Sequence, residues 1–326
     1  MMESAQAIST TREVAEELRK RRAFVMVSHV KPDGDTLGAG LALGLALKKL
    51  GKTVYYFQQD PVPRNLRFLP DTEDVSRVLP AALPPDALFV FCDMSDWRRA
   101  GELLPAVSQE NMLDIDHHLG NSHFGKLNYV LENECSTGTV VMHLLRELDI
   151  PIDAQIATCV LTTIMTDTGG FMHANTTPEA LELAAELMRL GANKEEITEE
   201  IFLKKRVAAT RLLGRIVEAM AFAHEGRYCY SYVDEAMLEQ TGADGEDTED
   251  MVNVLRGQEG VEVAALFKAI GGEIRVSLRS SGRVNVQAAA KAMGGGGHFR
   301  ASGLTCYGTL QAAFDEVDAA LVAEGL

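Results

Sequence analysis

Short apolar runs alternate with longer apolar or amphipathic stretches along the first half of the chain. The runs at residues 23–27, 53–58, 87–92 and 111–115 have the length and composition of buried strands. Between and after them, helical patterns cover residues 11–22, 36–50, 136–148 and 153–165, and a further helix begins at Thr177 and Pro178. Strands that alternate with helices predict an α/β domain built on a mainly parallel sheet.

The pattern changes in the second half of the chain. Residues 194–223 are helical in pattern and charged on one face, which is typical of a connection between domains. Strands are then predicted at residues 228–233, 261–269, 273–278 and 304–307, with a helix over 284–293. We therefore predict a first domain at 1–192, a helical connector at 193–224, and a second, smaller α/β domain at 225–326.

Composition places the chain among globular cytoplasmic proteins. Of its 326 residues 46% are apolar, yet no run approaches the length of a membrane span. The N-terminus lacks the basic start and apolar core of a signal peptide, so we expect a cytoplasmic protein with no membrane partner. Its five cysteines are odd in number and lie mostly among apolar residues, which predicts reduced core side chains.

The net charge restricts the class of partner. With 31 basic and 47 acidic residues the chain carries a formal charge of −16 and shows no basic stripe. Proteins that track along a nucleic acid neutralise many phosphates with Lys and Arg. A nucleic-acid substrate of this protein should therefore be short, and no long nucleic acid is expected as a partner. The acidic stretch at residues 244–250 is interpreted as a solvated loop.

Candidate chemistry gathers where predicted elements of the first domain end. In open α/β sheets, ligands bind beyond the carboxyl ends of the strands. Several carboxylates that converge there require cations or protons, because burying an isolated carboxylate is very costly. The residues at these ends are His29, Asp33, Asp35, Asp93, Asp116, His117, His118 and Asp167.

Each of these residues alone has a simpler interpretation. A single Asp after a strand is usually a helix cap or a turn residue, and a lone His is usually a surface or core residue. The joint pattern favours metal: His-x3-Asp-x-Asp, a strand-end Asp, Asp-His-His, and Thr-Asp-Thr-Gly follow one another in order. A carboxylate can bridge two cations, and a mixed imidazole and carboxylate set suits Mn²⁺, Co²⁺ or Fe²⁺ better than Mg²⁺.

These motifs closely resemble those of the DHH phosphoesterase superfamily. The resemblance implies that His29, Asp33 and Asp93 hold one divalent metal ion, Mn²⁺ being the first expectation. It implies a second ion with Asp93 as the bridge; its ligands would be Asp35, Asp93, His117 and Asp167. By the same resemblance His118 would face the scissile phosphate and Asp116 would orient a histidine. No position of this set is substituted.

A second motif, Gly-Gly-Gly-Gly-His-Phe-Arg-Ala-Ser-Gly, occupies residues 294–303. Four glycines alone would favour a flexible hinge, but followed by His, Arg and Ser they can let the backbone close on an anion. Arg279, at a predicted strand end, is suited to phosphate binding, although a surface charge is the alternative. The motif resembles the DHHA1 domain, which implies a substrate site in a cleft between the domains. Its residues would be Arg279, Ser280, Gly295, Gly296, Gly297, His298, Arg300 and Ser302.

The second domain narrows the choice of relatives. Family II pyrophosphatases carry a different C-terminal domain, RecJ-type exonucleases are longer, and membrane-bound cyclic-dinucleotide phosphodiesterases need membrane spans. The chain is most similar to the stand-alone nanoRNase and pAp phosphatase group. That implies hydrolysis of short oligoribonucleotides, such as pGpG or pApA, or of 3′-phosphoadenosine 5′-phosphate (pAp) to AMP. Cyclic dinucleotides, polyphosphate and pyrophosphate stay open as alternative substrates. A nucleotide-binding regulator without activity stays open as an alternative function, and a homodimer as an oligomeric state.

Overall fold

A computed structural model describes residues 8–326 of the chain. The chain divides into two compact units; the first ends at Lys204 and the second begins at Lys205. Of the segment predicted as a connector, α6 (Lys194–Ile197) and the π-helical turn η5 (Thr198–Leu203) lie in the first unit. Helix α7 (Val207–Glu218) lies in the second.

The first unit contains a six-stranded sheet in which every neighbouring pair is parallel. Its strand order is β3-β2-β1-β4-β5-β6, which reverses direction between β1 and β4. Such a reversal marks the ligand-binding edge of doubly wound sheets. The strands are β1 (Ala23–Val27), β2 (Thr53–Phe57), β3 (Val75–Ser76), β4 (Leu88–Cys92), β5 (Met112–Asp116) and β6 (Leu127–Val130).

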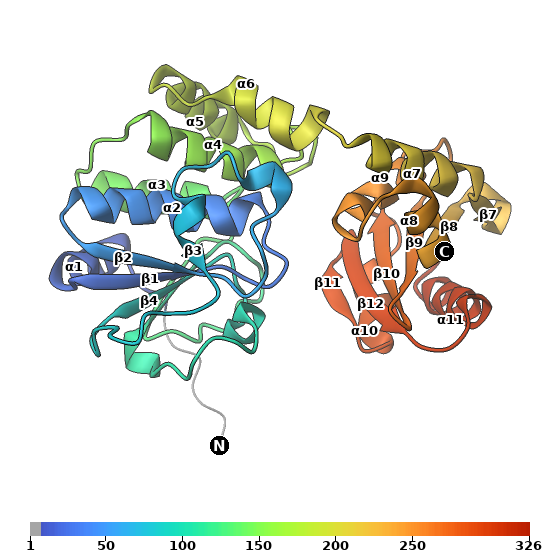
Figure 1. Ribbon diagram of the computed structural model, residues 1–326, viewed down its shortest axis with the longest axis horizontal. Helices are drawn as coiled ribbons and strands as arrows, with labels where there is room; N and C mark the ends of the chain where they lie inside the picture. The colour runs from blue at the N-terminus through green and yellow to red at the C-terminus, as the bar shows by residue number, and fades with distance from the viewer. Residues whose placement is uncertain (1–7) are drawn as a thin grey trace. The chain divides into compact units, whose positions relative to one another are not determined.

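Helices cover one face of this sheet in two layers (Figure 1). The other face is closed by loops and 3₁₀ turns, over a smaller core that includes Phe57, Phe89 and Phe91. Helix α2 is apolar all round, and thirteen of its residues are buried, as expected of a helix enclosed by others. The helices are α1 (Thr11–Lys20), α2 (Gly34–Lys49), α3 (Thr137–Glu147), α4 (Ala154–Asp167) and α5 (Pro178–Arg189).

Glycines on α2 and α3 allow α4 to pack very closely. A Cβ atom built on Gly38 would lie 2.8 Å from the carbonyl oxygen of Cys159. A Cβ on Gly138 would overlap the Thr163 side chain. These close contacts fix the start of α2, which carries Asp35, against the end of α4, which carries Asp167.

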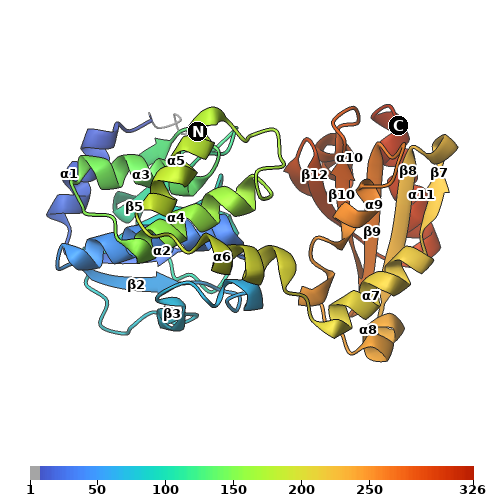
Figure 2. The same cartoon turned by 90° about the horizontal axis from the view of Figure 1, so that it is seen from above.

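The second unit has a mixed sheet of order β11-β12-β10-β9-β8-β7, in which only β8 and β9 are parallel. Helices α7 and α9 (Met251–Arg256) cover one face, and α10 (Val286–Ala292) and α11 (Leu310–Ala323) the other (Figure 2). Helix α8 is Glu235–Thr241. The strands are β7 (Ala221–Ala223), β8 (Tyr228–Asp234), β9 (Val263–Ile270), β10 (Glu273–Ser280), β11 (Gly296–His298) and β12 (Ala301–Cys306).

The α/β class and the parallel first sheet are as predicted, but four strands were not foreseen: β3, β6, β7 and β11. They have two to four residues each, which is too short for a periodic pattern to be recognised. β12 begins at Ala301 rather than at residue 304, because its first residues pair with the glycine-rich β11. All five cysteines are free and buried. Within residues 8–326, no helix has the length and apolarity needed to span a membrane.

Candidate metal centre and phosphate site

Eight side chains of the first unit, which we call the cradle, gather at one edge of its sheet. β1, β4 and β5 are neighbours that end together, since Val27 pairs with Phe91 and Cys92 with Ile115. The strand ends deliver five of the side chains and helices α2 and α4 bring the others, so the sheet edge predicted from the sequence is where they meet. The cradle consists of His29, Asp33, Asp35, Asp93, Asp116, His117, His118 and Asp167.

Asp93 lies at the centre and turns its two carboxylate oxygens toward different histidines. Oδ2 lies 3.4 Å from Nε2 of His29, and Oδ1 lies 3.6 Å from Nε2 of His117. The backbone of Asp93 has a φ of 64°, in the left-handed region that few non-glycine residues adopt. Thr137 donates a hydrogen bond of 3.1 Å to Oδ1. Asp93 is therefore held with one carboxylate oxygen toward each of two groups of potential metal ligands.

On the first side of Asp93, the ring nitrogen Nε2 of His29 also lies 3.7 Å from Oδ2 of Asp33. Asp33 is also a helix cap, as expected of a single aspartate that follows a strand. Its Oδ1 accepts hydrogen bonds from the amides of Asp35 and Thr36 at the start of α2. One oxygen thus caps the helix and the other faces the histidine. His29, Asp33 and Asp93 offer ligand atoms that all lie within 4.8 Å of one another.

The second group lies on the other side of Asp93. Nε2 of His117 is 3.6 Å from Oδ2 of Asp35 and 3.9 Å from Oδ2 of Asp167. These separations are too long for hydrogen bonds. They suit ligands of one cation, since two atoms each about 2.1 Å from a metal lie roughly 3–3.5 Å apart.

The two histidines of these groups have their other nitrogen bound to the backbone. Nδ1 of His29 lies 2.9 Å from the carbonyl oxygen of Val30, and Nδ1 of His117 lies 3.0 Å from that of Glu134. A carbonyl oxygen only accepts, so Nδ1 carries a proton, and Nε2 is the atom that presents a lone pair when the ring is neutral. Nε2 of His29 is buried and has no hydrogen-bond partner. A buried ring nitrogen without a hydrogen bond, placed among carboxylates, fits a divalent cation that displaces its proton.

His118 differs from His29 and His117 in the partner of its Nδ1. Its Nδ1 lies 2.7 Å from Oδ1 of Asp116, a fully buried carboxylate. The other oxygen of Asp116 accepts from Asn121 at 2.7 Å. Burial tends to lower the pKa of His118, but Asp116 and Asp93 together raise it. This histidine is therefore oriented by a charged partner that favours its protonated form.

The pKa values of the cradle carboxylates shift in opposite directions. Burial, followed by repulsion from Asp93 and Asp167, raises the pKa of Asp35 well above its usual range. Burial also raises the pKa of Asp167, to about 6. Burial acts on Asp93 in the same sense, but the neighbouring imidazoles of His29, His118 and His117 lower its pKa overall. Burial would lower the pKa of His29, yet Asp33 and Asp93 raise it to about 9. In the absence of metal, protons compensate the crowded charges.

Three residues that hold the carboxylates of Asp35 and Asp167, like Asn121 beside Asp116, were not identified from the sequence. The amides of Thr137 and Gly138, at the first turn of α3, donate to the two oxygens of Asp35 at 2.8 and 3.2 Å. A helix N-terminus stabilises a carboxylate in this position. Asn175 donates to Oδ2 of Asp167 at 3.1 Å and to the carbonyl oxygen of Cys135. From the sequence, Thr137 and Gly138 were placed only in a predicted helix over residues 136–148.

The candidates of the second unit share one corner of its sheet, where β10, β12 and β11 lie side by side. Arg279 pairs with Ala301, and Ala301 pairs with His298, so these three residues form one row across the strands. Side chains in one row point to the same face of a sheet. In the next row on that face, Ser277 pairs with Gly303 and Gly303 pairs with Gly296, so only one of the three has a side chain. The backbone beside His298 is therefore bare.

The two serines predicted for this group point to the opposite face of the sheet. Ser302 and Ser280 are buried, and they alternate with the Arg279 row. The hydroxyl of Ser302 donates to the carbonyl oxygen of His298 at 2.8 Å, and that of Ser280 accepts from the amide of Gly282 at 3.0 Å. The side chain of Arg300 lies over Gly282. The hydroxyls and Arg300 thus shape the corner, while half-buried Arg279 and exposed His298 share the other face of the sheet.

The glycine run forms an edge strand rather than a flexible hinge. A Cβ on Gly295 would lie 2.3 Å from the carbonyl oxygen of Gly303, and one on Gly297 would lie 2.6 Å from that of Ala301. Gly294 and Gly297 have φ values of 78° and 134°, which L side chains rarely adopt. Burial lowers the pKa of the Arg279 guanidinium, which donates to the carbonyl oxygen of Leu278 at 3.1 Å.

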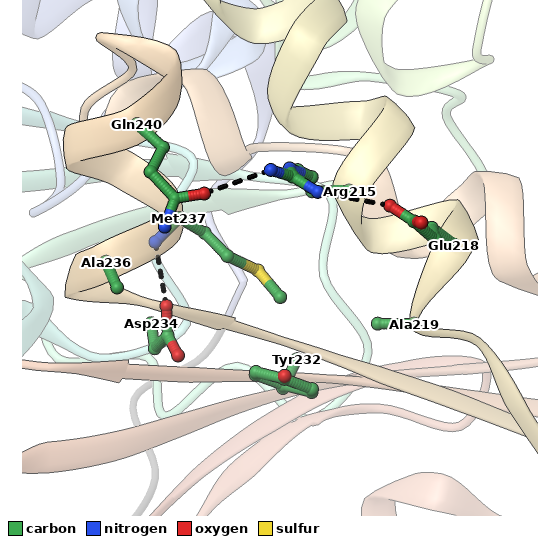
Figure 3. Close-up of a pocket in the computed structure, with 8 residues that line it drawn as sticks. All are labelled: Arg215, Glu218, Ala219, Tyr232, Asp234, Ala236, Met237 and Gln240. Carbon is green, nitrogen blue, oxygen red and sulfur yellow. Dashed lines mark hydrogen bonds and ion pairs between the residues drawn. The ribbon is translucent and has the colours of Figure 1, made fainter.

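A separate hollow of about 330 Å³ lies elsewhere in the second unit, beside α7, α8 and β8 (Figure 3). Arg215, at its rim, is already paired with Gln240 and Glu218. None of the predicted site residues lines this hollow. It is therefore separate from the cradle and from the corner of β10, β12 and β11 that carries Arg279 and His298, which we call the Arg279 corner.

Comparison with known proteins identifies both parts of the chain. Residues 23–164 match the DHH family, N-terminal domain, and residues 225–323 match the DHHA1 domain. The bifunctional oligoribonuclease and PAP phosphatase NrnA of Thermus thermophilus is 38% identical over 306 residues, which cover 93% of this chain and 91% of that protein. The protein of the same name from Bacillus subtilis is 25% identical over 298 residues, covering 90% and 91%.

The fold has a close counterpart among solved structures. An exopolyphosphatase-related protein from Bacteroides fragilis superimposes with a TM-score of 0.86 at 24% identity, covering 96% of this chain and 95% of that one. The likeness concerns the fold, whereas the sequence matches over both domains concern descent. The chain belongs to the DHH/DHHA1 phosphoesterase superfamily and is a metal-dependent phosphoesterase.

Proposed function

We propose that this protein hydrolyses short oligoribonucleotides to mononucleotides, and pAp to AMP, with two divalent metal ions, Mn²⁺ being preferred. The observation that carries the proposal is the position of Asp93, whose oxygens face His29 on one side and His117 on the other. The similarity to proteins named bifunctional oligoribonuclease and PAP phosphatase supports the substrate class.

In this proposal His29, Asp33 and Asp93 hold one ion, and Asp93 bridges to a second. The other ligands of the second ion are Asp35, His117 and Asp167. When bound, such a pair supplies Lewis acidity at the phosphate and lowers the pKa of an attacking water. The mixed nitrogen and oxygen donors support Mn²⁺ over Mg²⁺, which prefers oxygen ligands and retained water.

His118 then acts on the phosphate itself. Its Nδ1 is occupied by Asp116, so Nε2 is the atom that can reach a substrate. In the protonated state, which Asp116 favours, Nε2 donates a hydrogen bond to a phosphate oxygen and can pass its proton to the leaving oxygen. Asp116 keeps the proton on Nδ1 and holds the ring in place, with Asn121 fixing the carboxylate.

In this proposal the second unit recognises the substrate by binding its terminal phosphate. Arg279 and His298, beside bare glycine backbone, offer charge-assisted hydrogen bonds to a terminal phosphate. The acidic chain offers no basic stripe for further phosphates, which supports a preference for short substrates.

The test is a substrate panel with purified full-length protein that has been stripped of metal and reloaded. Dinucleotides, longer oligoribonucleotides, pAp, a cyclic dinucleotide and pyrophosphate are each assayed with Mn²⁺, Mg²⁺, Co²⁺ and Fe²⁺. We expect turnover of dinucleotides and pAp that depends on the metal, highest with Mn²⁺. Faster turnover of the cyclic dinucleotide or of pyrophosphate would reassign the substrate, and binding without any turnover would indicate a regulator.

Asp93→Ala tests the bridge. We expect it to abolish turnover and to lower the bound metal content measured by elemental analysis. Asp86→Ala is a matched control, because Asp86 is exposed and precedes the same strand at its opposite end. If Asp93→Ala kept two metal ions and normal rates, the assignment of the cradle would be wrong.

A further inference from the structure

Arg99 lies beside the cradle and belongs to none of the motifs that define it. It is in the 3₁₀ turn η3 (Trp97–Ala100), six residues after Asp93. Its carbonyl oxygen accepts from the amide of Val30 at 2.7 Å, directly after His29. Its Nη1 donates to the carbonyl oxygen of Asp93 at 3.4 Å. Arg99 is thus fixed between the residues that follow two strands of the cradle.

The guanidinium of Arg99 is half-buried and has no anionic partner in the structure. Among residues 8–326, no carboxylate oxygen forms an ion pair with it, although the cradle contains five aspartates. The neighbouring Arg98 shows the usual arrangement, because it is exposed and pairs with Asp96 at 2.5 Å. Partial burial of a guanidinium that bonds only a neutral carbonyl is unfavourable unless an anion completes it.

The position of Arg99 indicates that the anion that would pair with it is the phosphate of the substrate. Nη1 of Arg99 donates to the backbone carbonyl oxygen of Asp93, and Nδ1 of His118 lies 3.3 Å from Oδ1 of the same residue. Both groups therefore lie against Asp93, the residue on which the proposed reaction centre is built. The planar guanidinium can bind two phosphate oxygens at once. In phosphoryl transfer, charge spreads over the equatorial oxygens, and an arginine placed there stabilises the transition state.

We propose that Arg99 is a further catalytic residue, which binds the non-bridging oxygens of the phosphate under attack. This role rests on the proposed function and adds a contact that neither the metal ligands nor the Arg279 corner supplies. Because Arg99 would contact the reacting phosphate itself, its loss should affect every phosphate ester. A purely structural Arg99 would only support the backbone of Asp93, in which case its loss would disturb metal binding.

The experiment compares Arg99→Ala and Arg99→Lys with Arg98→Ala as the matched control. With Mn²⁺-loaded enzyme, we expect Arg99→Ala to lower kcat for a dinucleotide and for bis-p-nitrophenyl phosphate alike, by roughly a hundredfold or more. Arg99→Lys should recover part of the loss, since the charge remains but the bidentate geometry does not. Metal content should stay at the wild-type level, and Arg98→Ala should behave as wild type.

A second measurement does not depend on turnover. Inorganic phosphate, titrated calorimetrically into the Mn²⁺-loaded proteins, should bind at least tenfold more weakly to Arg99→Ala than to Arg98→Ala. Equal phosphate affinities, or rates within twofold of wild type, would overturn the role of Arg99 and leave the proposed function intact. Loss of metal in Arg99→Ala would also overturn it, in favour of the structural role. An inactive wild-type protein would instead refute the proposed function, and the phosphate titration would still decide on Arg99.

Discussion

Nδ1 of His118 lies 2.7 Å from Oδ1 of Asp116, and this is the shortest contact between a histidine and a carboxylate in the cradle. His29 and His117 instead direct Nδ1 to backbone carbonyl oxygens. The carboxylate partner raises the basicity of His118, whereas a neutral carbonyl leaves a ring suited to metal. The three neighbouring histidines therefore differ in the partner of Nδ1, which is the basis for assigning them two roles.

This division predicts separable effects of substitution. His118→Ala and Asp116→Asn should each lower kcat by about 10²–10⁴-fold and leave the metal content unchanged, because they act on proton transfer and orientation. His117→Ala should lose metal together with activity. Elemental analysis and steady-state kinetics of the three variants distinguish the cases. A metal loss in His118→Ala equal to that in His117→Ala would reverse the two roles.

Metal affinity should increase with pH. His29, with a pKa of about 9, is protonated at neutral pH when no metal is bound, so a cation must displace its proton. The logarithm of the apparent affinity should then rise by at least about one per pH unit below 9. Asp35, whose pKa burial also raises, and Asp167, with a pKa of about 6, bind further protons as the pH falls and steepen the dependence. Calorimetric Mn²⁺ titrations at several pH values, in buffers of different ionisation enthalpy, measure the released protons; an affinity independent of pH would contradict the prediction.

Arg279→Ala should impair only substrates that have a second phosphate. The lost charge-assisted bond is worth about 1.5–3 kcal/mol, which corresponds to about ten- to a hundredfold in kcat/KM for a dinucleotide. Hydrolysis of bis-p-nitrophenyl phosphate should barely change. Arg275→Ala is the matched control, since Arg275 is on the same strand and face, exposed and paired with Glu273. Equal losses on both substrates would mean that the Arg279 corner does not read the distal phosphate.

Chain length should limit turnover. The net charge of −16 gives no favourable field for additional phosphates, so rates should fall steeply beyond roughly five nucleotides. A series of oligoribonucleotides from two to thirty residues, assayed at fixed ionic strength, measures the decline. Efficient digestion of the longest member would reveal a basic path on the surface.

The packing of α2 against α4 should tolerate no side chain at Gly38. The added Cβ of Gly38→Ala would lie 2.8 Å from the carbonyl oxygen of Cys159, so we expect a loss of about 1–3 kcal/mol in unfolding free energy. Gly40→Ala is the control on the same helix, because its nearest neighbour would be Met26 at 3.7 Å. That variant should be neutral or gain up to about 1 kcal/mol from helix propensity. Urea unfolding of the full chain measures both, and equal stabilities would contradict the close packing.

The sequence by itself determined the α/β class and most of the cradle. Apolar runs that end at Val27, Cys92 and Ile115 were recognisable as strands, and parallel strands bring their carboxyl ends to one sheet edge. Histidines and aspartates placed directly after such runs must therefore meet. Asp167 follows the same logic at the end of a helix, where the Thr-Asp-Thr-Gly motif marked it.

Only the tertiary structure decided which groups orient these residues and which side chains complete them. Thr137 donates to Asp35 across 102 residues of sequence, a contact set by helix packing that no local pattern encodes. Arg99 and Arg98 are neighbours in sequence, yet one donates to the carbonyl oxygen of Asp93 and the other pairs with Asp96. In the second unit, strand pairing turned the glycine run into an edge strand and separated Ser302 from Arg279 and His298. Strand register and helix contacts depend on the whole fold, because they satisfy hydrogen bonds and close packing between distant segments.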